Sequence, residues 1–327
     1  MVNTKIKKIM FNLKPPEGSY GGGSFFVKNL STFLVSKGWK VTYELEDNLD
    51  IIVIIDPRAG NYKKHGLNDI REYKLKHPNV KLIYRVNECD IKREISINIE
   101  PLIVETMLSV NYVIFVSKWL QDYYIQKYNL INNNFNNLKY TSILNGCNQN
   151  HFYNTKLKKI NPNKIRIVTH HWSNNYLKGF HIYNKLDQIL PDCPTIEFTY
   201  IGNYNPNYQP KNIKIKKPMC GIELGKELKQ HDIYLTATQN EPGAMHYLEA
   251  MSSGLPVIYC NGGGGVHEIC QKAGEEFTDM TNFFIKLNKI IDNYDNYVKN
   301  IDKTYLSSDR CSSEYYQIIS KLQEFKN

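Results

Sequence analysis

The chain has 327 residues, the length of roughly two domains, and its 41 Lys and Arg exceed its 32 Asp and Glu to give a formal net charge of +9. Its hydrophobic share of 42% and charged share of 22% are ordinary for a globular protein and exclude a disordered or fibrous chain. The positive balance is compatible with an anionic substrate, with peripheral contact to an anionic membrane or with a lysine-rich solvated surface, whereas nucleic acid is disfavoured because no basic run is interleaved with aromatic residues.

Short apolar runs alternate with longer amphipathic segments in the first half of the chain. Runs without polar alternation predict buried strands, at 8–13, 51–55, 81–86 and 112–117. Apolar residues with helical spacing predict helices at 24–38, 99–109 and 117–128. The first of these helices ends at Gly38, a residue type that commonly follows the last helical turn.

Two polar breaks, at 132–137 and 154–164, precede a second half in which the same rhythm restarts. Strands are predicted there at 165–172, 196–202, 213–217, 232–238 and 256–260. Helices are predicted between and after them, at about 179–190, 222–230, 243–253 and 277–299, with a last helix at 312–325.

Alternating strands and helices predict parallel sheets that are covered by helices on both faces. Two such runs joined by a polar linker predict an α/β protein of two Rossmann-like domains, 1–157 and 158–309, with 310–327 free to pack back on the first domain. Ligands of such sheets bind outside the carboxyl ends of the strands. We therefore expect the two domains to face each other across a cleft that holds the ligand.

Cysteine usage and hydropathy bear on the cellular compartment. Seven cysteines, at 89, 147, 193, 220, 260, 270 and 311, are odd in number and form no C-x-x-C pair, so neither a zinc site nor a disulfide framework is indicated. No apolar run has the length of a signal peptide or approaches the roughly 20 residues of a membrane span. We expect a cytoplasmic protein with reduced thiols, soluble or peripheral to a membrane.

The stretch "NEPGAMHYLEAMSSGLPVIYCNGGGG" (240–265) holds two carboxylates eight residues apart. Glu241 falls in the loop at a strand's carboxyl end, and the amides of Gly243 and Ala244 are expected to open the helix and to favour an anion or a sugar hydroxyl. Glu249 falls about two turns into the helix, and a carboxylate can hold the vicinal hydroxyls of a ribose. The alternative is that Glu241 only stabilises the helix N-terminus and Glu249 is solvated.

This stretch resembles the signature of the retaining GT-B glycosyltransferases of the GT4 family. Members usually read E-P-x-G, then E-A-M-A-x-G-x-P-V, then G-G-x-x-E, and the matching residues here are Glu241 to Gly243, Glu249 to Val257, and the glycines before Glu268. The segments 112–124, 143–153 and 199–205 are also similar to family segments in the expected order. The resemblance implies the GT-B fold, which is two Rossmann-like domains facing each other.

The resemblance also assigns Lys178, in the Lys178-Gly179 pair, to the diphosphate of a sugar donor; an exposed loop lysine is the alternative. Relatives usually carry an arginine five residues before this lysine, and here that position is Ser173. The departure leaves the diphosphate one cation short. Ser173 with nearby amides, or Arg85, would have to compensate.

Further candidates come from loops of the first half and from the middle of the second. Gly22 and Gly23 belong to a glycine-rich stretch after the first strand that lets backbone approach phosphates or acceptor, unless it is only a flexible turn. Arg85 and Asn87 follow a buried strand, where a polar cluster favours substrate contact. Backbone near Met219 and Cys220 is expected to meet the nucleotide base. The histidines at 170, 171 and 246 have no metal-ligand spacing, and a structural role is favoured for them.

Taken with the motifs, the resemblance implies an enzyme: a retaining, metal-independent glycosyltransferase of the hexosyltransferase type, without a cofactor, that moves a sugar from a nucleoside-diphosphate-sugar such as a UDP-sugar to a glycan or glycoconjugate hydroxyl. The expected catalytic residues are Glu241, Lys178, Arg85 and Asn87. A sugar-nucleotide epimerase and a non-catalytic sugar-nucleotide binder remain as alternatives. A nicotinamide dehydrogenase is disfavoured, because this sequence lacks the G-x-G-x-x-G motif that such an enzyme requires.

Overall fold

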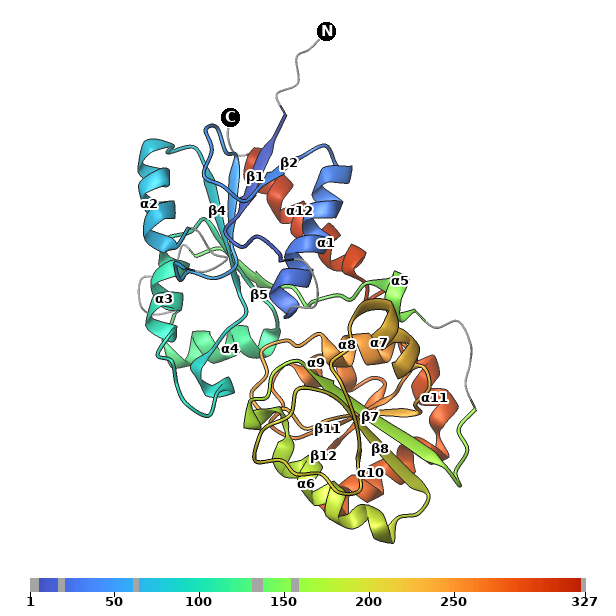
Figure 1. Ribbon diagram of the computed structural model, residues 1–327. Coiled ribbons are helices and arrows are strands. Elements are labelled where there is room, and N and C mark those ends of the chain that lie inside the picture. The colour runs from blue at the N-terminus through green and yellow to red at the C-terminus, as the bar shows by residue number, and fades with distance from the viewer. Residues whose placement is uncertain (1–5, 17–20, 61–64, 131–137, 154–158, 325–327) are drawn as a thin grey trace. The chain divides into compact units, whose positions relative to one another are not determined.

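The computed structural model describes residues 6–16, 21–60, 65–130, 138–153 and 159–324. The chain forms two units, each built on one six-stranded sheet with helices on both faces (Figure 1). Unit 1 comprises Met1–Asp90, Ile97–Asn145 and Ser308–Asn327, and unit 2 comprises Ile91–Ser96 and Gly146–Ser307.

The unit 1 sheet has the strand order β2-β1-β3-β4-β5-β6, and every paired strand is parallel to its neighbour. Its strands are β1 (Lys8–Phe11), β2 (Lys40–Thr42), β3 (Ile51–Ile54), β4 (Lys81–Val86), β5 (Tyr112–Phe115) and β6 (Tyr140–Ser142). The helices of this unit are α1 (Gly22–Ser36), α2 (Leu67–Lys76), α3 (Glu100–Leu108), α4 (Lys118–Lys127) and α12 (Ser308–Glu324).

Both faces of this sheet are buried, which explains why apolar residues dominate its central strands. Side chains alternate along β1, so that Ile9 and Phe11 join one hydrophobic cluster and Met10 joins another. The first cluster contains residues of α1 and α12, and the second contains residues of α2, α3 and α4. The last helix therefore packs in unit 1, beside α1.

The unit 2 sheet has the order β12-β11-β10-β7-β8-β9 and is also parallel throughout its paired strands. Its strands are β7 (Ile165–His171), β8 (Ile196–Gly202), β9 (Lys214–Lys216), β10 (Ile233–Thr236), β11 (Val257–Cys260) and β12 (Gly274–Phe277). Its helices are α5 (Gln149–Phe152), α6 (Phe180–Ile189), α7 (Gly221–Leu228), α8 (His246–Ser252), α9 (Val266–Cys270), α10 (Met280–Asp292) and α11 (Tyr294–Lys299).

The two units divide between Asn145 and Gly146, whereas the sequence prediction set the boundary at 157/158. Residues 146–153 join unit 2 because α5 packs against α7 and α8. The packing is tight, since a Cβ at Gly225 of α7 would lie 2.0 Å from the carbonyl oxygen of His151.

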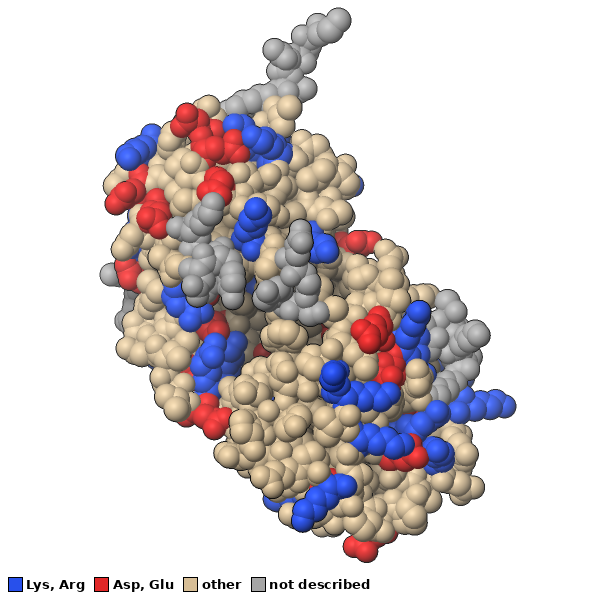
Figure 2. Space-filling model, viewed as in Figure 1, with Lys and Arg blue, Asp and Glu red and all other residues tan. Residues whose placement is uncertain are grey.

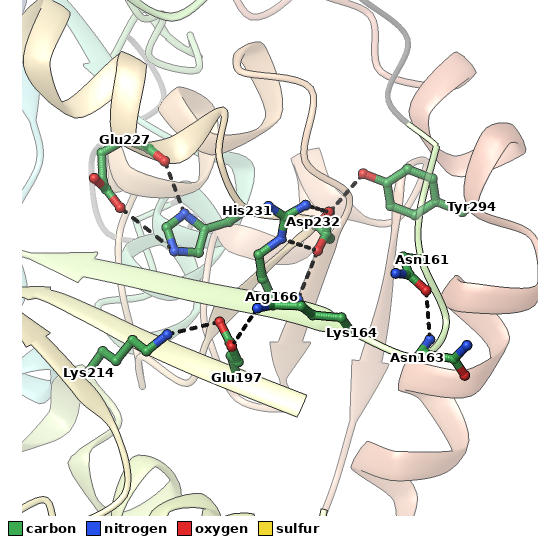
Figure 3. A network of polar contacts seen from close by, with 10 residues as sticks. All are labelled: Asn161, Asn163, Lys164, Arg166, Glu197, Lys214, Glu227, His231, Asp232 and Tyr294. Atoms are coloured by element: carbon green, nitrogen blue, oxygen red, sulfur yellow. Dashed lines mark hydrogen bonds and ion pairs between the residues drawn. The ribbon is translucent and has the colours of Figure 1, made fainter. Parts of the chain in front are cut away.

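The amino edge of the unit 2 sheet is held by ion pairs (Figure 3). Arg166 of β7 donates from Nε and Nη2 to the Asp232 carboxylate at 3.0 and 3.1 Å, and the hydroxyl of Tyr294 donates to the Asp232 carbonyl at 2.9 Å. Lys164 and Lys214 each lie 3.0 Å from the Glu197 carboxylate. The ion pairs link neighbouring strands and Tyr294 joins α11 to the sheet, so this edge is structural. The predicted ligand residues lie at the opposite, carboxyl edge.

Candidate functional site

Two loops at the carboxyl edge of the unit 2 sheet hold the central pair of predicted residues. The loop after β7 leads into a 3₁₀ turn, η2 (Tyr176–Lys178), and the loop after β10 leads into α8. Because β7 and β10 are paired neighbours, the loops lie side by side, and the amide of Gln239 donates to the Leu177 carbonyl at 2.8 Å. Across this contact Lys178 Nζ donates to Glu241 Oε2 and forms an ion pair with it.

The Lys178–Glu241 pair is largely removed from solvent. Glu241 is 9% exposed, and the Lys178 side chain is 21% exposed. Burial acts to raise the pKa of Glu241, but the positive charges of Lys178 and Lys92 outweigh burial and lower this pKa to about 2. Glu241 is therefore an ionised acceptor near neutral pH, suited to hydrogen bonds from hydroxyl groups.

Glycines hold the Glu241 loop through close backbone contacts. Gly264 forms a parallel bridge with Glu241, and the Gly265 amide donates to the Glu241 carbonyl at 2.9 Å. A Cβ at Gly264 would lie 2.5 Å from the Glu241 carbonyl oxygen, and φ at Gly264 is +78°. Only glycine tolerates both conditions. The glycine cluster of the family signature thus has a structural task in this chain, which is to fix the position of Glu241.

Glu249 lies in α8 and contacts a histidine of β7. His170 Nε2 is 2.9 Å from Glu249 Oε2, and the side chains are 10% and 13% exposed, respectively. The backbone of His170 is in turn held by Tyr234, whose hydroxyl accepts from the His170 amide at 3.2 Å. Glu249 is therefore a half-buried carboxylate positioned by His170, and it is not a solvated helix residue.

The other two histidines at this edge are core residues. His171 Nε2 lies 2.9 Å from the hydroxyl of Tyr183, and His246 Nε2 lies 3.0 Å from Thr236 Oγ1. Burial, aided by neighbouring positive charge, lowers the pKa of both histidines well below the usual value. Both rings are therefore neutral, and they form hydrogen-bonded packing beneath the two loops.

The helix that carries Glu249 begins later than the sequence prediction. We expected Gly243 and Ala244 to open it, but α8 begins at His246 with Met245 as its N-cap, so this expectation is wrong. The physical reason is that the Glu241 backbone is tied to the glycine segment, and the residues after it must turn before helical bonding can start. Gly243 and Ala244 are half-buried in that turn, and their contact with a donor sugar stays a prediction.

A cavity of about 610 Å³ opens at the carboxyl ends of β7, β8 and β9, within the size range of small-molecule sites. It is lined by Trp172, Asn174, Gly202, Asn203, Tyr204, Ile215, Lys216, Lys217 and Pro218. Met219 and Cys220 are half-buried and directly follow this lining. Ser173 is exposed, and its hydroxyl accepts from the Asn175 amide at 3.2 Å.

The predicted residues of unit 1 gather at the carboxyl edge of its own sheet. Gly22 and Gly23 form the first turn of α1, and a Cβ at Gly23 would lie 3.9 Å from the Asn87 amide group. Arg85 is only 1% exposed. Its guanidinium lies 4.2 Å from the Phe26 ring centroid, and Nη2 donates to Asn145 Oδ1 at 2.9 Å. Those are the partners of a structural residue, and the substrate contact of Arg85 stays a prediction.

Sequence reasoning missed a segment of unit 2 at this site, Ile91–Ser96. The Lys92 carbonyl accepts from Asn175 Nδ2 at 3.1 Å, and the Ile91 carbonyl accepts from Asn240 Nδ2 at 3.2 Å. Glu94 Oε1 accepts from the Tyr176 amide at 2.5 Å. The basic Lys92-Arg93 pair, just after the polar stretch 84–90, was the available signal.

The described residues contain neither a cluster of metal-binding side chains nor a membrane-spanning helix. In the described ranges, no group of three or more His, Cys, Asp or Glu side chains is arranged to hold a metal ion. No helix among those same residues is both long and apolar enough to cross a bilayer. On the face drawn in Figure 2, Lys and Arg side chains are interspersed with Asp and Glu side chains.

Residues 210–307 match the family described as glycosyl transferases group 1. This range contains Glu241, Glu249 and the glycine cluster, the central motif of the resemblance, whereas the Lys178-Gly179 pair and the segments 112–124, 143–153 and 199–205 lie outside it. Among curated proteins, none matches this chain in sequence.

Solved structures share the fold over nearly the whole chain. Sucrose-phosphate synthase from Thermosynechococcus elongatus superimposes with a TM-score of 0.69 at 12% identity, covering 97% of this chain and 99% of that one. HepE from Anabaena, in complex with UDP and glucose, gives 0.68 at 14% identity, covering 97% and 100%. WaaG, a glycosyltransferase involved in lipopolysaccharide biosynthesis, gives 0.66 at 12% identity, covering 95% and 99%. The predicted GT-B fold is confirmed and, with the family match, so is the prediction of a glycosyltransferase enzyme.

Proposed function

We propose that this glycosyltransferase is retaining and metal-independent, and that it moves a hexose from a nucleoside-diphosphate-sugar to a hydroxyl group of a glycan or glycoconjugate. The observation that carries the proposal is the buried Lys178–Glu241 pair at the ends of adjacent strands, with Glu249 in the helix that follows. A UDP-sugar is the first donor to consider, because HepE, which shares the fold, was solved with UDP and glucose.

The nucleoside part of the donor is assigned to the cavity and to α8. Trp172 and Tyr204 line the cavity and are 51% and 46% exposed, so their rings offer stacking surfaces for a base. Backbone near Cys220, next to the cavity lining, remains our candidate for contact with the base edge. Glu249, held by His170, accepts hydrogen bonds from the two ribose hydroxyls.

The diphosphate and sugar are assigned to the Lys178–Glu241 pair. Lys178 binds the diphosphate, which requires it to exchange part of its contact with Glu241 for phosphate oxygens. Glu241 then accepts hydrogen bonds from the sugar hydroxyls. The loop contact of Gln239 with Leu177 holds the two loops together, so the backbone positions of both groups are set before the donor binds.

Retention follows if donor and acceptor react on one face of the sugar. The bond between the anomeric carbon and a diphosphate oxygen breaks, the acceptor oxygen bonds to the same face, and the acceptor proton passes to the leaving diphosphate. Lys178 stabilises the negative charge on the departing diphosphate, the task that a metal ion performs in other transferases. Glu241, ionised, stabilises positive charge developing on the sugar ring and has no proton to donate.

A donor panel tests this proposal. The chain is incubated with UDP-glucose, UDP-galactose and GDP-mannose, with and without oligosaccharide acceptors, and with EDTA. The release of UDP or GDP and the anomeric configuration of the product are followed by NMR. Acceptor-dependent release with retention, unaffected by EDTA and lost in Glu241→Gln, is expected. Epimerised donor without release would instead indicate an epimerase, binding without turnover a non-catalytic binder, and an inverted product would overturn the retaining mechanism.

A further inference from the structure

The proposed donor site has fewer positive charges than its ligand requires. A nucleoside-diphosphate-sugar carries two negative charges on its diphosphate, and Lys178 is already paired with Glu241. The position where relatives carry an arginine is Ser173, whose exposed hydroxyl accepts from the Asn175 amide. Ser173 therefore adds no charge.

The segment Ile91–Ser96 of unit 2 is bound to both loops that carry the Lys178–Glu241 pair. It is joined to the loop before Lys178 through the Lys92 carbonyl and the Glu94 carboxylate, which accept from Asn175 and Tyr176. It is joined to the Glu241 loop through the Ile91 carbonyl, which accepts from Asn240 Nδ2 at 3.2 Å. Three hydrogen bonds thus position this segment over the place where the two loops meet.

In this segment the apolar side chains are exposed and the basic side chains are half-buried, the reverse of the usual pattern. Ile91 is 37% exposed and Ile95 is 82% exposed, whereas Lys92 and Arg93 between them are half-buried. Isoleucine is normally buried and lysine normally exposed. The reversed pattern indicates that Lys92 and Arg93 face a polar environment. That environment includes Glu241, on which the charge of Lys92 acts.

We propose that Lys92 is the second diphosphate-binding cation of this enzyme, in place of the arginine that relatives carry at the position of Ser173. The inference rests on the proposed function. Lys92 adds a second positive charge to that of Lys178, and both charges also act on Glu241, so donor binding redistributes existing charge contacts without burying a new uncompensated cation.

Calorimetric titration with UDP and GDP, each compared with its monophosphate, tests the proposal. Lys92→Ala should weaken binding of the diphosphate by about tenfold or more, the loss of a charge-assisted hydrogen bond, and weaken the monophosphate much less. Lys92→Arg should retain most of the affinity. Lys164→Ala is the matched control, because it removes the same charge from a 58% exposed lysine at the amino edge of β7, and it should bind as the unmodified chain does.

A second measurement uses the position where relatives carry the arginine. Adding Ser173→Arg to Lys92→Ala should recover diphosphate affinity if one cation replaces the other. No recovery, an equal loss for monophosphate and diphosphate, or unchanged binding by Lys92→Ala would overturn the role of Lys92. If the unmodified chain binds neither diphosphate, the proposed function itself fails, and the inference fails with it.

Discussion

The ionised state of Glu241 is the feature of single residues with the widest consequences. Its carboxylate is buried, yet nearby lysines lower its pKa to about 2 from the 4.5 of an ordinary glutamate. A folded-state pKa below the unfolded one means that the unfolded chain takes up the proton first as the pH falls. The ionised carboxylate therefore stabilises the fold above about pH 4.5, and this stabilisation is lost as the pH falls toward 2.

Glu241→Gln tests this dependence, because glutamine resembles the protonated acid at every pH. The variant should be less stable than the unmodified chain at pH 6, and the difference in unfolding free energy should shrink by on the order of 2 kcal/mol by pH 3. Urea denaturation of the variant and of the unmodified chain at pH 6 and pH 3 measures this difference in unfolding free energy. A difference that stays constant would show that Glu241 is not held ionised by its neighbours.

The contact between His170 and Glu249 leads to a prediction about ribose. Glu249→Ala should weaken UDP binding by about tenfold, since the hydroxyls lose a charged acceptor. It should also remove any preference for UDP over 2′-deoxy-UDP. His170→Ala should weaken UDP binding less, because it releases Glu249 without removing it. Competition titrations report these affinities, and a Glu249→Ala chain that still discriminates against the deoxy ligand would contradict the assignment.

Motif residues and their supporting partners differ in how far the sequence predicts them. Glu241 and Lys178 are 63 residues apart but are brought together, as expected for residues after neighbouring strands of one sheet. The partner of Glu249, His170, lies 79 residues away, and its spacing gives no hint of the pairing. For Lys92 the sequence offers only the basic Lys92-Arg93 pair after the polar stretch 84–90. That pair does not show which loops the segment contacts, because two of its three contacts are made by backbone carbonyls.

Among the elements, the central strands are the best predicted. The strands β4 and β8 have the predicted bounds, because most of their residues are apolar and buried. The strands β2, β6 and β12 are missed, since each lies at a sheet edge and carries polar side chains. The predicted helix at 277–299 is in fact two helices, α10 and α11, interrupted at Asn293.

Loop elements depend on glycine for two separable reasons, backbone angle and crowding. Gly264→Ala combines both, since φ is +78° and the new Cβ would meet backbone at 2.5 Å. Gly38→Ala is the matched control, with φ of +82° and nothing within 4 Å. We expect about 1 kcal/mol of destabilisation for Gly38→Ala and clearly more for Gly264→Ala. Thermal denaturation and UDP binding measure both, and equal effects of the two substitutions would exclude crowding at Gly264.

At the scale of the whole molecule, the chain leaves unit 1 for the short segment Ile91–Ser96, leaves it again after Asn145 and returns to it at Ser308. The last helix, α12, completes the hydrophobic cluster on the α1 face of the unit 1 sheet, where the rings of Phe26 and Tyr315 lie 4.8 Å apart. An amphipathic pattern shows that this helix has an apolar face but does not identify the sheet that receives it. The sequence therefore left the destination of α12 open.

Unit 1 should consequently be destabilised by substitutions at the far end of the chain. Ile319 of α12 is fully buried, so Ile319→Ala should cost about 2–5 kcal/mol. Hydrogen exchange should show the loss in the amides of α1 and β1, while those of β7 and β8 in unit 2 keep their protection. Ile285→Ala, at a 60% exposed position of α10, is the matched control and should leave both units unchanged. Equal loss of protection in β7 and β8 would mean that the two units unfold as one, so that α12 stabilises the whole chain and not unit 1 alone.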